Sequence, residues 1–109
     1  MSNSQTVMNG TTLQRWVTIA DPQGLHMRPA AAFAKLARQF QSRVTVSRDN
    51  RSVNGKSQLD LMLLAAEPGA QLLLEISGDD APDALAALGG VLEISDWDAN
   101  GVTEEPLTG

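Results

Sequence analysis

Apolar and polar residues alternate along residues 13–20 and 43–47, and this alternation predicts β-strands with one buried face. A short edge strand after a hairpin turn and a short apolar run add two further predicted strands. In the first stretch Arg15 interrupts the apolar side, which otherwise consists of leucine, valine and isoleucine. The last stretch is the most apolar, and it indicates a strand at the centre of a sheet. The four predicted strands are residues 13–20, 43–47, 52–53 and 71–76.

Three other stretches repeat apolar residues at intervals of three and four, the spacing of an amphipathic helix. The first runs from Pro29 to about Phe40, and proline suits the first helical position because its missing N–H costs nothing there. The second begins after Ser57, which forms an S-x-x-D capping pattern with Asp60. Its predicted buried stripe consists of Leu59, Met62, Leu63 and Ala66.

The third helix is predicted after Asp80, an acidic N-cap residue followed by Pro82 and by leucines at helical intervals. Gly89 and Gly90 lie inside this pattern, and a glycine costs about 1 kcal/mol relative to alanine in a helix interior. We therefore expect this helix to be short, closely packed at the glycines, or frayed beyond them. The complete order of elements predicts an α+β fold in which a small antiparallel sheet carries the helices on one face.

The length of 109 residues suits one small domain, which we expect to cover residues 13–95. Residues 1–12 are polar and aperiodic and predict a disordered lead, and residues 96–109 predict an acidic tail from which Trp97 could fold back. The absence of cysteine and the single histidine argue against disulfides and metal sites, and no cofactor is expected. No apolar run approaches the roughly 20 residues of a membrane span, so we expect a cytoplasmic protein with no membrane insertion.

Charge is unevenly distributed along the chain, whose net charge is −5. Eight basic and two acidic residues give residues 1–56 a charge of +6, whereas eleven acidic residues give residues 57–109 a charge of −11. A solvated acidic tail explains part of this bias. The alternative is a basic face around the only histidine, His26, that attracts acidic proteins. Nucleic acid is not expected as a partner, because no aromatic residues alternate with the basic ones.

The candidate functional segment is residues 24–29 (GLHMRP), at the junction between the first strand and the first helix. Gly24 permits a tight turn before the helix. The first N–H groups of the helix lack acceptors within the helix, and they therefore attract anions. A phosphoryl group on His26 would lie where these groups and the Arg28 guanidinium share its charge. A neutral imidazole also offers a nucleophilic nitrogen, as a phosphoryl carrier requires.

Two simpler interpretations compete with this one. A lone histidine at the start of a helix is more often a polar turn residue, but the neighbouring glycine, arginine and proline in this spacing favour a phosphoacceptor at His26. Residues 55–57 (GKS) match the end of a phosphate-binding P-loop. That motif needs a further glycine five residues before Gly55, where Asn50 stands, so the match is rejected.

Residues 24–31 (GLHMRPAA) resemble the active-site signature of HPr, the histidine-containing phosphocarrier of the bacterial phosphoenolpyruvate-dependent sugar phosphotransferase system. Lys56 and Ser57, with a strand before them and apolar residues after them, resemble the regulatory serine segment of that family. The similarity extends from about Arg15 to Ile94. It implies an HPr-like open-faced sandwich, in which a four-stranded antiparallel sheet carries three helices on one face in the order βαββαβα.

By this resemblance, His26 accepts a phosphoryl group from phosphorylated enzyme I and passes it to enzyme IIA domains, with Arg28 beside the phosphate. The protein would be a stoichiometric carrier and a monomer, not an enzyme. Ser57 corresponds to the serine that HPr kinase/phosphorylase modifies in some bacteria, although its capping pattern also gives it a structural role.

The resemblance also implies a partner-docking surface near His26, formed by Met27, Lys35, Leu59 and Met62. Gln58 stands where the family usually has a bulky apolar residue, and Asp60 adds charge to the same helix. These departures leave a second function open. It is that of an HPr-like regulatory protein, in a nitrogen-related or catabolite-control pathway, that acts mainly by phosphorylation-dependent binding.

Overall fold

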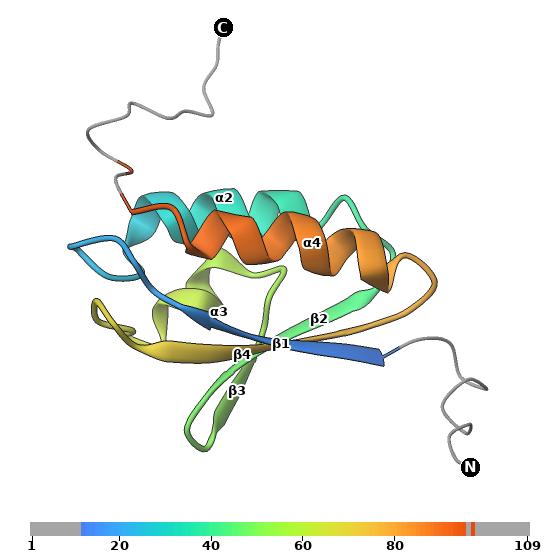
Figure 1. The fold of residues 1–109 in the computed structure, drawn as a ribbon, viewed down its shortest axis with the longest axis horizontal. Helices are drawn as coiled ribbons and strands as arrows, with labels where there is room; N and C mark the ends of the chain where they lie inside the picture. The colour runs from blue at the N-terminus through green and yellow to red at the C-terminus, as the bar shows by residue number, and fades with distance from the viewer. Residues whose placement is uncertain (1–11, 96, 98–109) are drawn as a thin grey trace, which may run out of the picture.

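The computed structural model describes residues 12–95 and 97, which form a four-stranded antiparallel sheet with three helices on one face (Figure 1). This confirms the predicted α+β open-faced sandwich and its order of elements. The lead predicted at residues 1–12 and the tail predicted at residues 96–109 lie outside the described residues, except for two positions. Thr12 is the first residue of a strand, so the lead prediction was wrong there, and Trp97 is described below. In chain order the elements are β1 (Thr12–Thr18), α2 (Met27–Ala37), β2 (Arg43–Arg48), β3 (Arg51–Asn54), α3 (Gln58–Met62), β4 (Gln71–Ser77) and α4 (Ala81–Leu92).

Strand β4 lies in the centre of the sheet, whose strand order is β1-β4-β2-β3, as its apolar sequence predicts. It pairs along its whole length with β1 and on its other side with β2. Leu72, Leu74 and Ile76 of β4 are fully buried, and the residues between them lie on the outer face of the sheet. That outer face is open to solvent, and Trp16 of β1 is 64% exposed on it.

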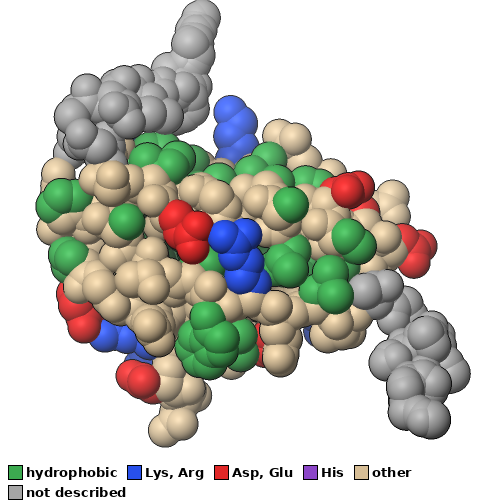
Figure 2. Space-filling model, viewed as in Figure 1, with side chains coloured by type: hydrophobic (Ala, Val, Ile, Leu, Met, Phe, Trp, Pro, Cys, Tyr) green, Lys and Arg blue, Asp and Glu red, His purple; other side chains and the backbone are tan. Residues whose placement is uncertain are grey.

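Helices α2 and α4 run side by side above the sheet and close the core (Figure 1). Phe33 of α2 and Leu88 of α4 are fully buried between the helices and the strands. On the face seen in Figure 2, charged side chains of both signs are scattered among hydrophobic ones. That face therefore carries no broad patch of one charge.

Helix α2 begins at Met27, two residues earlier than predicted, so Pro29 is not its first residue. The backbone of His26 is extended (φ −93°, ψ −169°), and its carbonyl accepts the N–H of Ala30 at 3.1 Å. His26 is therefore the N-cap residue. Pro29 is still tolerated, because none of the first three residues of a helix needs its N–H for an intrahelical bond.

Helix α3 has only five residues, and its predicted buried stripe was wrong. Leu59 is 78% exposed, Met62 37% and Leu63 59%, whereas Leu61 and Leu64 are buried. The segment is apolar on several sides, so its periodicity alone does not decide which side faces the core. Ala66 is buried as predicted, but it lies beyond the helix.

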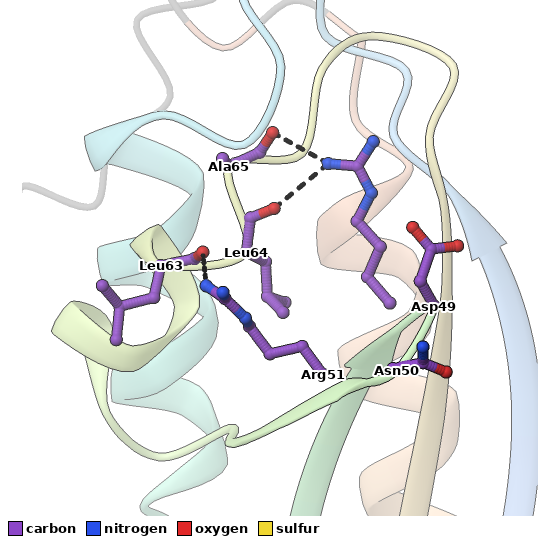
Figure 3. Close-up of a pocket in the computed structure, with 7 residues that line it drawn as sticks. Asp49, Asn50, Arg51, Leu63, Leu64 and Ala65 are labelled. Atoms are coloured by element: carbon purple, nitrogen blue, oxygen red, sulfur yellow. Dashed lines mark hydrogen bonds between the residues drawn. The ribbon is translucent and has the colours of Figure 1, made fainter.

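Both ends of α3 are held by contacts outside its own backbone. The Ser57 hydroxyl accepts the N–H of Asp60 at 3.1 Å, which confirms the predicted cap. At the other end, Arg51 donates to the carbonyl of Leu63 and Arg48 to the next two carbonyls (Figure 3). These arginines line a hollow between the β2–β3 turn and the end of α3. The acceptors are the carbonyls of the C-cap residue and of the two residues after it, so the arginines fix the chain where it leaves α3.

Helix α4 is continuous through Gly89 and Gly90, and close packing explains the first of these glycines. A Cβ atom at Gly89 would lie only 2.2 Å from a guanidinium nitrogen of Arg15. Arg15, which interrupts the inner face of β1, crosses this glycine and pairs with Glu93 at 3.0 Å. Nothing lies within 4 Å of a Cβ built at Gly90.

The loop between β1 and α2 is joined to the loop that follows α3. Leu25 donates its N–H to the carbonyl of Ala66 at 2.9 Å. Gly24 has a positive φ of 75°, and a Cβ there would lie 2.5 Å from that same carbonyl oxygen. A glycine is therefore required for the approach of the two loops as well as for the turn.

We expect alanine at Gly24 to destabilise the fold more than alanine at Gly69, although both glycines have a positive φ. At Gly69 the loss is limited to backbone strain of about 1–3 kcal/mol, because nothing lies within 4 Å of the new Cβ. At Gly24 the contact with Ala66 adds to this strain. Urea denaturation measures both free energies of unfolding, and equal losses would contradict the close contact.

Alanine at Gly90 is expected to raise the free energy of unfolding by up to about 1 kcal/mol, because alanine is the better helix former. Alanine at Gly89 should give a smaller gain or a loss, since its methyl group must displace Arg15 from Glu93. Thermal unfolding of the two variants provides the comparison. Equal gains would show that Arg15 does not press on Gly89.

Candidate functional site

The imidazole of His26 lies at the positive end of α2 but does not cap it. The residue occupies the N-cap position, yet its side chain makes no capping hydrogen bond. The side chain is 20% exposed, so the ring is neither fully buried nor fully solvated. The N–H groups of Met27 and Arg28 have no acceptor within the helix. An anionic group carried by the ring would therefore lie near the positive end of the helix dipole.

The ring of His26 faces a buried carboxylate, that of Asp21, which was not among the residues predicted for the site. Asp21 is 3% exposed, and its Oδ1 lies 3.4 Å from the Nε2 of His26. That nitrogen is inaccessible to solvent and forms no hydrogen bond with the described residues. The sequence did carry a signal, because Asp21 is one of only two acids among residues 1–56 and precedes the only histidine by five residues.

Backbone groups from two distant parts of the chain hold this carboxylate. The N–H of Gln23 donates to Oδ1 at 2.7 Å, and the N–H of Trp97 donates to Oδ2 at 3.1 Å. Burial alone would raise the pKa of Asp21, but these two N–H groups and the His26 imidazole together hold that pKa below its usual value. Asp21 is therefore ionised at neutral pH.

Trp97 lies at the point where the acidic tail was expected to begin, and it packs against the domain. Its side chain is 3% exposed. Its indole N–H finds no acceptor among the residues that the structure describes. Trp97 thus folds back onto the domain, as the sequence suggested. It brings the chain after α4 to residues 19–26 between β1 and α2, which we call the histidine loop.

The predicted docking residues lie on α2 and α3. Met27 at the start of α2 is 61% exposed, and its carbonyl accepts a long hydrogen bond of 3.4 Å from the side chain of Gln58. This contact brings the start of α2 next to α3, where Leu59 and Met62 are exposed. Leu63, which the prediction placed in the core, is exposed beside them. We call Met27, Leu59, Met62 and Leu63 the apolar patch.

Most basic side chains of the first half of the chain are bound within the domain. Five of the eight form ion pairs with glutamates or donate to backbone carbonyls; these are Arg15, Arg38, Arg48, Arg51 and Lys56. Arg28 and Lys35, seven residues apart on α2, are both exposed. Arg28, two residues after His26, is the nearest of the basic residues along the chain.

No three histidine or acidic side chains converge among the described residues. Within the same residues, no helix is long and apolar enough to cross a membrane. The hollow between Arg48 and Leu63 is lined by residues of the β2–β3 turn and the end of α3, and His26 is not among them (Figure 3).

Comparison with known proteins places this site in a family. Residues 13–93 match the family described as "PTS HPr component phosphorylation site". The phosphocarrier protein HPr of Cupriavidus necator is 43% identical over 76 residues, which cover 70% of this chain and 85% of that protein.

Solved structures show the same similarity. HPr of Bacillus anthracis superposes with a TM-score of 0.72 at 32% identity, covering 76% of this chain and 99% of that one. Crh, the catabolite repression HPr of Bacillus subtilis, superposes with a TM-score of 0.57 at 36% identity, covering 74% of this chain and 96% of that one. Since the match runs from β1 to the end of α4 and its relatives are phosphocarriers, the chain belongs to the HPr family of the phosphotransferase system.

Proposed function

We propose that this protein carries phosphoryl groups on His26, accepting them from phosphorylated enzyme I and donating them to enzyme IIA domains. The position of His26 carries this proposal. The residue is the N-cap of α2, its ring makes no capping hydrogen bond, and 20% of the side chain is exposed. The ring is therefore available for chemistry at the end of a helix that favours negative charge.

In the proposed transfer, a ring nitrogen of His26 attacks the phosphorus with its lone pair. The new P–N bond forms as the bond from phosphorus to the donor breaks, and the bonding electrons leave with the donor. The first N–H groups of α2 and the guanidinium of Arg28 stabilise the charge on the phosphoryl oxygens. Donation to the acceptor reverses these steps and returns the electron pair to the ring nitrogen.

A carrier must also protect its phosphoryl group from water. Both oxygens of Asp21 already accept backbone N–H groups, and its carboxylate is buried. It is therefore poorly placed to act as a base that activates water. The phosphoryl group should persist until a protein acceptor binds.

The proposed docking surface for these partners is the apolar patch. Lys35 of α2, which was predicted as a docking residue, is included in this proposal. Exposed apolar residues that adjoin one another are typical of protein interaction sites. The carboxylate of Asp60, which was expected to add charge to this surface, is directed away from it. It is half-buried and accepts the N–H of Asn54 at 3.3 Å, so it is directed toward the end of β3.

Modification of Ser57 by a kinase is a separate proposal. The hydroxyl already serves α3 as its cap. A phosphoryl group there would place new negative charge beside Asp60 and next to the apolar patch. Phosphorylation of Ser57 would therefore affect the docking of partners more directly than it would affect the chemistry at His26.

A regulatory role is the second candidate, supported by the polar Gln58 in α3 and by the similarity to the catabolite repression HPr of Bacillus subtilis. In this case phosphorylation of His26 would change which proteins bind, and no donation to a sugar-specific acceptor would be needed. Transfer from the phosphorylated protein to purified enzyme IIA separates the two functions.

Enzyme I and radiolabelled phosphoenolpyruvate are expected to label the protein with an acid-labile, base-stable phosphate, and to leave His26→Ala unlabelled. The substitution should preserve the fold, because the side chain makes no capping hydrogen bond. Circular dichroism of the variant is the control. Label that remains on a folded His26→Ala protein would overturn the proposal.

Aspartate at Leu59 is expected to slow phosphorylation by enzyme I about tenfold, which corresponds to about 1.4 kcal/mol of lost interaction. The matched control is aspartate at Trp16, which is similarly exposed but lies on the outer face of the sheet. Initial labelling rates of the two variants are compared with that of the unchanged protein. Equal rates for both variants would exclude Leu59 from the docking surface.

A further inference from the structure

We propose that residues 98–109, which we call the tail segment, bind back onto the apolar patch and onto the exposed basic residues of α2, and that they compete there with protein partners. A segment of the same chain would thus occupy the surface next to His26 until a partner displaces it. The inference rests on the proposed function, because the competing partners are the proteins that give and take the phosphoryl group.

The first argument is the point from which the tail segment starts. Trp97 is 3% exposed, and its backbone N–H donates to Oδ2 of Asp21 at 3.1 Å. Oδ1 of the same carboxylate lies 3.4 Å from Nε2 of His26, and Met27 of the apolar patch is the next residue along the chain. The tail segment is therefore tethered beside the histidine loop and close to the start of α2.

The tail segment is also long enough to reach the whole patch from this point. An extended chain spans at most about 3.6 Å per residue, which gives residues 98–109 a reach of roughly 40 Å. The patch begins at Met27 and continues onto α3, which a hydrogen bond from Gln58 joins to the start of α2. A short tether gives a segment an effective concentration in the millimolar range, so weak contacts are enough for it to compete.

Charge favours this contact. The tail segment contains three acidic residues, Asp98, Glu104 and Glu105, and no basic one. The surface beside the patch has the opposite charge, since Arg28 and Lys35 are exposed on α2. An exposed ion pair contributes little binding free energy by itself, but complementary charge selects the surface that a segment binds.

Apolar residues of the tail segment supply the remaining contacts. Val102 and Leu107 lie on either side of the two adjacent glutamates. In the patch, the side chains of Met27, Leu59 and Leu63 are exposed. Removing such surface from water favours association. The tail segment therefore carries both kinds of group, acidic and apolar, that this surface would bind.

A second copy of the chain is a poorer occupant of the same surface. In a symmetric dimer formed through the patch, each copy presents the same face to the other. The exposed basic residues of α2 would then approach their counterparts, and like charges in an interface oppose association. The tail segment brings acidic residues to them instead.

The test uses the full chain with a nitroxide label on Thr108→Cys, which is specific because the sequence contains no cysteine. The label broadens the NMR signals of nuclei near it. The ¹³C-methyl signals of Met27 and Met62 report on the patch, and the indole N–H of Trp16 reports on the outer face of the sheet. We expect both methionine signals to lose most of their intensity and the Trp16 signal to keep it.

Because the label is tethered beside the histidine loop, it approaches α2 even without binding, and matched variants measure the specific part. Glu104→Gln with Glu105→Gln, and separately Leu107→Ser, should restore most of the lost intensity. The control is Asp79→Asn with Asp83→Asn, which removes the same charge from exposed residues at the start of α4 and should restore none.

Three results of these spectra would overturn the inference. One is a Trp16 signal that is attenuated as strongly as the methionine signals. Another is methionine intensity that stays low in both kinds of tail variant. The third is loss of the methionine signals in a mixture of nitroxide-labelled protein and ¹³C-labelled protein, which would assign the contact to a second copy.

Phosphorylation by enzyme I gives a functional measurement without the nitroxide. At protein concentrations below saturation, the double glutamine variant of the tail segment should be labelled about two- to tenfold faster, because a competitor that covers half to nine tenths of the molecules is removed. The double asparagine control should keep the original rate. An unchanged rate in the tail variant would overturn the inference. If enzyme I labels none of these proteins, the proposed carrier function fails and the NMR spectra still decide whether the tail segment binds.

Discussion

The histidine loop and the loop after α3 meet so closely that only a glycine backbone fits between them. Gly24 lies against the carbonyl of Ala66, and the next residue, Leu25, donates its N–H to that carbonyl. This contact decides where the chain turns after β1 and therefore where α2 begins. Because His26 follows directly, the direction of its ring and its place at the helix end depend on the same contact.

Helix α3 is a second element whose structure depends on its surroundings. A helix of five residues is far below the length at which helices are stable alone. Ser57 satisfies an N–H at its start, and Arg48 and Arg51 satisfy carbonyls at its end. Since these polar contacts and two buried leucines hold it, the remaining apolar side chains are left on the surface. The same arrangement that stabilises α3 therefore creates the apolar patch.

The buried carboxylate of Asp21 connects residues from both ends of the domain next to His26. Burial of the Asp21 carboxylate is unfavourable by itself, and the two backbone N–H groups that offset this cost come from positions 23 and 97. The chain beyond α4 thus contributes to the site. A stable charge in the interior gives the imidazole a fixed polar neighbour, and the ring also lies at the start of α2.

Much of this protein was determined by local sequence. Residues within a few positions of one another were enough to predict the strands, the Ser57 cap, the central position of β4 and His26 as the candidate phosphoacceptor. This is possible because periodicity and capping act over one or two turns. The tertiary structure decided what such patterns leave open: which side of α3 is buried, why Gly89 is tolerated beneath Arg15, and which carboxylate faces the histidine. Those outcomes depend on contacts between residues far apart in the chain, such as the one from Trp97 to Asp21, and only the packing of the whole domain brings them together.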